Sequence, residues 1–332
     1  MADFNRLPDE SFEDYFVRLF ENKALYKLDC NKIAELLNAE NGENYGECKY
    51  RKEYAAFLRG RIYERESVER GVKTKILSIS DTHYPFQLPK ELLVNYIGKI
   101  DILQLNGDIV DNQAISRFPK QYRISPMEEI IGARKYLIEL IDYVHPKKVV
   151  CNLGNHDKRF ASYISRNLDT DLLELLPDSS LELIFVDGIR HYDKRSKAKV
   201  FYEPLKSVFE PEGIQIEFVD DWKVKIGRTW FCHPLAYRSA IMGTADKCKG
   251  YLQDIDTEGF DALCMAHTHK TGDTYKGNIR LFEQGAFASV EEMDYADGKL
   301  VSPQQKGFAL ICQDRNGNLV QKASKVINLS NI

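Results

Sequence analysis

The sequence predicts an α/β protein with a separate helical segment at its N-terminus. Between residues 75 and 312, short apolar runs alternate with amphipathic helical segments, which is the pattern of parallel βαβ units. Residues 1–72 instead contain only segments with apolar residues at helical spacing. We therefore expect two domains, a helical segment over residues 1–72 and an α/β domain over residues 73–332.

The composition fits a soluble globular protein and excludes a membrane partner. Of the 332 residues, 43% are hydrophobic and 29% are charged, and the net charge is −4. This net charge does not indicate nucleic acid as a partner, although it is compatible with a basic face on one part of the surface. No apolar run approaches the roughly 20 residues that span a bilayer, and the N-terminus lacks a secretory pattern. Seven scattered cysteines without a CxxC pair favour a reducing compartment, so we expect a cytoplasmic protein.

The N-terminal segment predicts three helices, at Ser11–Glu21, Asn31–Asn38 and Gly46–Glu66. The last two, separated by a turn rich in Gly and Asn, resemble a helix-turn-helix DNA-binding unit. From Glu47 to Lys75 there are nine Lys or Arg against five Asp or Glu. The cations expected to contact DNA lie near the start of the third helix and are Lys49, Arg51 and Lys52. The alternative is a helical hairpin that packs on the larger domain or mediates dimerisation.

The larger domain follows the alternation element by element. Strands are expected at Ile76–Ile79, Ile102–Leu105, Val149–Leu153, Ile214–Ile226, Thr229–Cys232, Ala262–Met265, Ile279–Phe282 and Phe308–Cys312. Helices are expected at Lys90–Ile100, Met127–Val144, Phe160–Leu176 and Ser239–Gln253. Arg315–Asn318 predicts a hairpin turn. This order fits a sandwich of sheets flanked by helices.

Polar side chains follow five of these strands at the point where each strand ends. Ligand sites of open α/β sheets form beyond the carboxyl ends of the strands. Five of the seven histidines lie at these points. The five pieces are Asp81-Thr82-His83, Gly107-Asp108-x-x-Asp111, Gly154-Asn155-His156-Asp157, His233 and His267-Thr268-His269.

Each piece alone is compatible with an ordinary polar loop. The glycines and Asn155 also suit tight turns, where a positive φ is tolerated. His267 and His269 are more specific, because alternation in an extended segment places both imidazoles on one side. Five such pieces in order, each after a strand, predict a metal site.

The ordered set resembles the calcineurin-like metallophosphoesterase superfamily over roughly residues 73–325. The resemblance implies a four-layer α/β/β/α metallophosphoesterase sandwich with a binuclear metal site. Ala266 stands where the family usually has Gly, which crowds the backbone slightly and removes no ligand. A second resemblance is to small metallophosphoesterases of bacteriophages and prophages, including members that resemble DNA repair nucleases.

The superfamily resemblance also implies roles for individual residues. The first metal ion would be held by Asp81, His83, Asp108 and His269, and the second by Asp108, Asn155, His233 and His267. Mn²⁺ is the first expectation for a ligand set without thiolates, with Fe or Zn²⁺ as alternatives. His156 matches the position of the general acid for the leaving group, and Asp111 the position that orients it. Asp157 is expected to cap the helix that begins near Lys158.

The substrate is the least determined part of the prediction. Asp111 is followed by Asn112-Gln113 rather than the Arg-Gly of Ser/Thr protein phosphatases, which disfavours that class. We expect a phosphodiesterase or nuclease that acts on DNA. The alternatives are a hydrolase of small nucleotides with a structural N-terminal segment, and a DNA-binding regulator with a vestigial metal domain. The basic stretch 191–199 is expected to form a solvated loop or a flap over the site.

Overall fold

The computed structural model describes residues 4–116, 124–169, 171, 176–194, 196–293 and 304–330. Its contacts divide the chain into two compact units, Met1–Arg70 and Gly71–Ile332. The division lies two residues before the expected boundary. Within the described ranges, no helix is long and apolar enough to cross a membrane.

The N-terminal unit is a small helical domain with its own core. Its helices are α1 (Phe12–Glu21), α2 (Lys23–Tyr26), α3 (Cys30–Asn41) and α4 (Glu47–Gly71). Ser11 begins α1 by accepting a hydrogen bond from the Asp14 amide, and Asp29 begins α3 in the same way. Buried aromatic and aliphatic side chains of α1, α3 and α4 form the core, including Tyr15, Leu37 and Tyr50. The three expected helices are therefore present, and the third continues to Gly71.

A six-stranded sheet forms the first layer of strands in the larger unit. Its order is β13 (Lys325–Asn328), β12 (Gly307–Gln313), β1 (Thr74–Ile79), β2 (Ile102–Asn106), β3 (Lys148–Asn152) and β6 (Gln215–Val219). Strands β1, β2, β3 and β6 are parallel to their neighbours in this run. Their carboxyl ends therefore lie at one edge of the sheet.

A five-stranded sheet forms the second layer. Its order is β10 (Thr271–Lys276), β11 (Ile279–Gln284), β9 (Ala262–Met265), β8 (Thr229–Cys232) and β7 (Lys223–Ile226). Strands β8, β9 and β11 are parallel to one another. A separate hairpin consists of β4 (Ile189–Asp193) and β5 (Ala198–Tyr202). The basic stretch 191–199 thus lies in a β-hairpin, not in a loop, and its Arg195 is outside the described residues.

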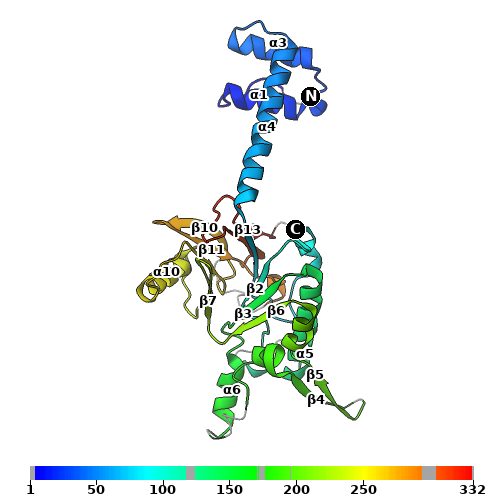
Figure 1. Ribbon diagram of the computed structural model, residues 1–332, viewed down its shortest axis with the longest axis vertical. Coiled ribbons are helices and arrows are strands. Elements are labelled where there is room, and N and C mark those ends of the chain that lie inside the picture. Colours follow the sequence, from blue (N-terminus) through cyan, green and yellow to red (C-terminus); the bar gives the residue numbers. More distant parts are fainter. Residues whose placement is uncertain are drawn as a thin grey trace. The chain divides into compact units, whose positions relative to one another are not determined.

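Three hydrophobic clusters establish four layers. One cluster lies between the sheets and joins residues such as Ile76 and Val150 of the first sheet to Phe231 and Phe282 of the second. Helices cover the outer faces: α5 (Pro126–Val144) and α9 (Leu205–Phe209) on the six-stranded sheet, and α10 (Gly243–Ile255) on the five-stranded sheet. Figure 1 shows α5 and α10 on opposite sides of the strands. The α/β/β/α sandwich is confirmed.

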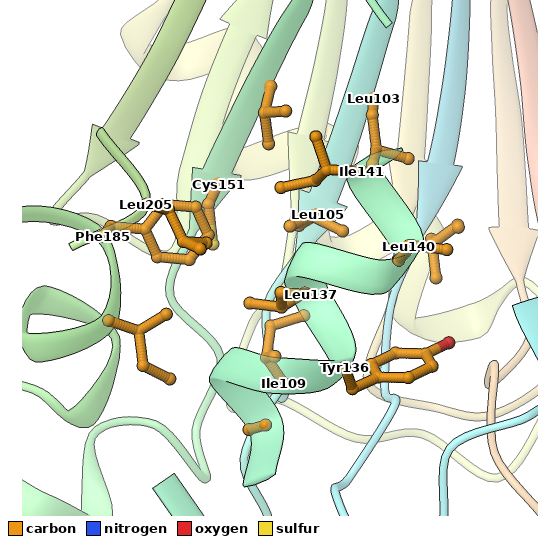
Figure 2. Close-up of a cluster of buried hydrophobic side chains, with 14 of the residues drawn as sticks. Leu103, Leu105, Ile109, Tyr136, Leu137, Leu140, Ile141, Cys151, Phe185 and Leu205 are labelled. Atoms are coloured by element: carbon orange, nitrogen blue, oxygen red, sulfur yellow. The ribbon is translucent and has the colours of Figure 1, made fainter. Parts of the chain in front are cut away.

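The largest cluster shows how α5 binds its sheet. Leu137, Leu140 and Ile141 recur at helical spacing and point toward Leu103 and Leu105 of β2 (Figure 2). Ser125 and Glu128 form a capping box that fixes the start of the helix. These contacts hold the carboxyl end of β2 in place.

Two expected helices are shorter or tighter than predicted. Lys90–Ile100 contains a 3₁₀ helix over Lys90–Tyr96, because Pro89 and Gly98 leave room for only a few tight turns. The helix expected at Phe160–Leu176 is α6 (Arg159–Asn167). The Asn167 side chain donates to the Tyr163 carbonyl and competes with the helical backbone there. Residues 170 and 172–175 lie outside the described residues.

The remaining elements are short helical turns, strands that the sequence did not predict as such, and one tight turn. Ser180–Glu182 (α8) is followed by a π-helical turn over Leu183–Asp187, and short 3₁₀ turns occupy Gln113–Ile115, Glu210–Glu212 and Val290–Glu292. The expected strand at Ile214–Ile226 is divided into β6 and β7. Strands β10 and β13 were not predicted, since their sequences lack a clear apolar alternation. The turn expected at Arg315–Asn318 is present, where the Gly317 amide donates to the Asp314 carbonyl.

A network of uncharged polar side chains lies between the two sheets below the strand ends. The Ser78 hydroxyl lies within hydrogen-bond distance of Oε1 of both Gln104 and Gln284 and can donate to either one, and Gln104 donates to Asn152. Asn152 in turn donates to Asn106 at 3.0 Å. All five side chains are fully buried. The network connects both sheets directly beneath the predicted site.

Candidate metal centre

The structure brings the predicted histidines and aspartates together at one edge of the sandwich. Three groups of described side chains have ligand atoms within 4.8 Å of one another. The first group is Asp81, His83 and His269, the second is Asp108, His233 and His267, and a third joins His83, Asp108 and His156. The first two groups contain only residues that the resemblance implied as ligands, whereas the third includes His156. Strands β1, β2, β8 and β9 end next to these residues, and β3 ends next to Asn155.

The loops at these strand ends have an unusual backbone. Five of the seven expected ligands adopt a positive φ, although none of them is glycine. They are Asp81, His83, Asp108, His267 and His269. Such conformations cost on the order of 1 kcal/mol or more each and concentrate at functional sites. The expectation that His267 and His269 lie on an extended segment is wrong. Both residues have a left-handed backbone conformation, and their side chains belong to different groups.

Two glycines allow the loops after β2 and β3 to touch. A Cβ on Gly154 would lie 2.1 Å from Oδ1 of Asp108, and one on Gly107 would lie 2.4 Å from the Gly154 amide nitrogen. Only Gly107 has a positive φ. Gly154 is therefore required for space and not for conformation, since the Asp108 carboxylate occupies the position of its missing side chain.

Asp157 holds these loops and does not cap a helix, which corrects the expectation. Its carboxylate accepts hydrogen bonds from the amides of Asp108 at 2.7 Å and Gly154 at 2.8 Å. The side chain is fully buried, and burial beside Asp108 raises its pKa to about 7. Helix α6 begins after Lys158 without a side-chain cap. Asp157 thus joins the backbone of Asp108 to that of Gly154 in the neighbouring loop.

Asp111 contacts two histidines. Its Oδ1 lies 2.7 Å from Nδ1 of His156 and 3.1 Å from Nδ1 of His83. This carboxylate can therefore hold His156 with Nδ1 protonated and Nε2 facing outward. The contact with His83 was not predicted. It shows that Asp111 supports one residue of the first group as well.

Arg159 is a residue of the site that sequence reasoning missed. Its guanidinium lies 2.8 Å from Nε2 of His156 and donates to the Asp111 carbonyl at 2.9 Å. Arg159 is on the first turn of α6, three residues after His156. His156 precedes the helix, and the turn between the two residues, closed by the Arg159 amide donating to the His156 carbonyl at 3.0 Å, brings their side chains together. The short spacing was the only available indication in the sequence.

The donor atoms fit divalent ions. Oδ1 of Asn155 is buried and accepts no hydrogen bond from any described residue. Nδ1 of His233 lies 2.7 Å from the Asn106 carbonyl, so Nε2 is the ring nitrogen that could bind a cation. Ligating histidines commonly use the second ring nitrogen in this way. Carboxylate, imidazole and amide donors together suit borderline or hard cations.

The carboxylates of the site stay anionic despite their burial. Burial alone would raise the pKa of Asp81 and of Asp108, but neighbouring histidines lower both well below the usual range. The pKa of Asp111 is lowered in the same way by His156 and His83. The aspartates therefore offer charged carboxylates to a cation, whereas the same contacts raise the pKa of His83 to about 10 and that of His233 to about 9, so these imidazoles must release protons when a cation binds.

The cations expected to contact DNA lie in the N-terminal unit, whereas the metal-site residues lie in the larger unit. Lys49 and Arg51 form ion pairs along α4 with Glu53 at 3.8 Å and Glu47 at 3.2 Å. Nζ of Lys49 also lies 3.1 Å from the centroid of the Tyr45 ring. Lys52 is exposed. Part of the expected basic face is therefore neutralised within its own helix.

Comparison with known proteins gives two family matches. A family model described as calcineurin-like phosphoesterase matches residues 74–271, and one described as the YonJ N-terminal domain matches residues 1–69. The SPbeta prophage-derived uncharacterized protein YonJ of Bacillus subtilis (strain 168) is 41% identical over 61 residues. That match covers 18% of this chain, and the chain spans about 15% of that relative's length. The expected resemblance to a prophage protein is confirmed.

Solved structures with a similar arrangement are distant. A Vps29 single mutant from Entamoeba histolytica is 14% identical, with a TM-score of 0.37, and covers 78% of this chain and 100% of its own. An archaeal phosphodiesterase is 13% identical, with a TM-score of 0.34, and covers 77% and 100%. Neither likeness is close enough to carry a substrate to this chain.

Proposed function

Because the chain belongs to the calcineurin-like phosphoesterase family, we propose that it hydrolyses phosphodiester bonds in nucleic acid, with DNA as the expected substrate. The chain is a phosphoesterase with an intact buried cluster of His and Asp side chains, typical of a binuclear metal site. The observation that carries the proposal is the pairing of that cluster with a histidine held ready for proton transfer.

The proposed ligands divide into two sets that share Asp108. Asp81, His83 and His269 would complete the first set, and the second would be completed by Asn155, His233 and His267. Two divalent ions, Mn²⁺ first and Fe or Zn²⁺ as alternatives, would supply an activated nucleophile and charge neutralisation at the phosphate. Asp157 supports the shared ligand by accepting from its backbone amide and from the Gly154 amide of the neighbouring loop.

His156 is the proposed general acid. Asp111 holds its Nδ1 at 2.7 Å, so Nε2 is the nitrogen left to face the leaving oxygen, and the imidazole must first take up a second proton before Nε2 can deliver one. Arg159 faces the same nitrogen at 2.8 Å. A phosphate that approaches His156 would therefore meet a guanidinium, which suits planar recognition of phosphate oxygens. We infer that Arg159 positions the substrate anion beside the general acid.

The preference for DNA is supported by the helical pair α3–α4, whose connection spans residues 42–46. Lys49, Arg51 and Lys52 lie in the first two turns of α4. The ion pairs of Lys49 and Arg51 with glutamates favour the second candidate, a phosphodiesterase of small nucleotides. The intact cluster of His and Asp side chains argues against a regulator with a vestigial metal domain.

A substrate panel tests the proposal. Metal-stripped protein reloaded with Mn²⁺ would be offered a chromogenic phosphodiester, a phosphomonoester, single-stranded DNA and duplex DNA. The proposal expects DNA cleavage well above the small esters, and a loss of DNA affinity when Lys49, Arg51 and Lys52 are all changed to Gln. Lys32→Gln, at an exposed position of α3, is the control. Turnover of small esters alone, unchanged by the triple variant, would favour the second candidate.

A further inference from the structure

We propose that an apolar cavity beside the second group of ligands binds the nucleobase next to the scissile phosphate. The inference rests on the proposed function for the position of the phosphate. What it adds is a binding site for the nucleobase. The cavity has a volume of about 380 Å³. Ligand pockets typically span roughly 300–1,000 Å³, so a single base with its sugar is of the right size.

The cavity is continuous with the metal centre. Asn155 and His233, both expected to bind the second ion, form part of its wall. A group seated in the cavity is therefore adjacent to the position of the reacting phosphate. Nucleotides combine these two parts, since a planar base lies one sugar away from its phosphate.

Two aromatic side chains give the cavity its character. Trp222 precedes β7, and Tyr251 lies on α10, with ring centroids 5.7 Å apart at an interplanar angle of 46°. Tyr251 is 49% exposed although it is aromatic. Aromatic faces of this kind stack on every base, independent of sequence. A planar heterocycle uses these faces better than an acyl chain does.

The opposite wall is firmly held. It begins at Pro234–Ala236 and continues into a loop that precedes α10. The buried ammonium of Lys270 donates to the carbonyls of Arg238 and Ser239 at 2.9 and 2.7 Å. The Arg238 amide donates to Thr244, which itself lines the cavity. The hydrogen bonds of Lys270 and Arg238 thus hold the loop that continues from this wall of the cavity.

The charge at the cavity selects an anion. Lys158 and Lys247 are among the lining residues, and no acidic residue is. Neither lysine forms an ion pair with a residue that the structure describes. Apolar walls, aromatic faces and two available cations together match a nucleoside phosphate. They do not match a neutral apolar ligand.

The test compares substrates that differ only in the base. A dinucleotide and its abasic counterpart, with equal phosphate charge, would be hydrolysed by the full chain in Mn²⁺. We expect KM for the abasic compound to be about 10- to 100-fold higher, from the loss of stacking. Tyr251→Ala and Trp222→Leu should move the ratio of the two KM values toward one. Tyr275→Ala is the matched control, since Tyr275 is 47% exposed on β10 and lies outside the cavity.

Binding measured without turnover separates this inference from the proposed function. Calorimetry would compare a nucleoside 5′-monophosphate with deoxyribose 5-phosphate on the same Mn²⁺-loaded protein. Tighter binding of the nucleotide that depends on Tyr251, in a protein that hydrolyses no diester, would retain the cavity and overturn the proposed function. Equal KM values or equal affinities with and without the base would overturn the cavity, even where diesters are hydrolysed.

Discussion

Replacing Gly154 with alanine should disable the site with little change elsewhere. The added methyl group would lie 2.1 Å from Oδ1 of Asp108, whereas ordinary contacts begin at 3.4 Å, so the carboxylate must retreat by about 1.3 Å. Backbone atoms of Asp108 lie almost as close, at 2.3 Å, which prevents a purely side-chain adjustment. A misplacement of about 1 Å can reduce catalysis roughly 100-fold. We expect kcat/KM for a chromogenic diester to fall at least about that much.

The stability change should be modest by comparison, about 1–3 kcal/mol for a single overpacked methyl group. Mn²⁺ affinity, measured by calorimetry on metal-stripped protein, should fall together with activity because Asp108 belongs to both ligand sets. Gly250→Ala is the control: a Cβ at Gly250 meets nothing within 4 Å and lies inside α10. It should leave activity intact and stabilise slightly. Normal turnover and metal affinity in Gly154→Ala would refute the assignment of Asp108 as the shared ligand.

Four further outcomes are expected. His156→Ala should lower kcat by about 10²–10⁴ while calorimetry shows Mn²⁺ binding retained; an unchanged kcat would exclude His156 as the general acid. Arg159→Gln should lower kcat/KM by roughly 10- to 100-fold through lost charge-assisted hydrogen bonds, whereas Arg166→Gln on the same helix should not. Burial raises the pKa of Glu129 to about 8 from 4.5, so the folded protein retains a proton that the unfolded chain releases. The free energy of unfolding should then fall as the pH rises from 5 to 8, by at most about 1.4 kcal/mol per pH unit, and urea titrations of Glu129→Gln should lack this contribution. Mn²⁺ should raise the thermal midpoint of the metal-stripped protein, and less so in Asn155→Ala; equal shifts would remove Asn155 from the ligand set.

The fold was predictable wherever pattern and burial agree. Parallel strands such as Ile102–Leu105 are buried on both faces, so their apolar runs are plain in the sequence. The strand Thr271–Lys276 was missed because its exposed edge position leaves Gly, Asp and Thr free to occupy it. The helix at Lys90 was mistaken in type, since apolar spacing over seven residues does not distinguish an α-helix from a 3₁₀ helix.

The site was predictable to the extent that it follows strand ends. Residue type and order were enough to place His233 beside Asp108, although they lie far apart in the chain. The role of Asp157 was misjudged because a polar residue before a helix fits both a cap and a buried support, and only the fold of the neighbouring loop decides. The cavity could not be foreseen at all. Its aromatic pair, Trp222 and Tyr251, comes from the residue before β7 and from α10, and no local sequence pattern indicates that these two segments pack together.

The uncharged network between the sheets has a consequence for how this sequence can change over time. Ser78 donates to another member, and Gln104 and Asn152 each both accept and donate within the network, so replacing one of the three by an apolar residue leaves a buried partner without its hydrogen bond. Single replacements should therefore be selected against, while simultaneous replacement of the whole set by well-packed apolar residues would be tolerated. Among relatives that retain this sandwich, we expect these positions to vary together or not at all.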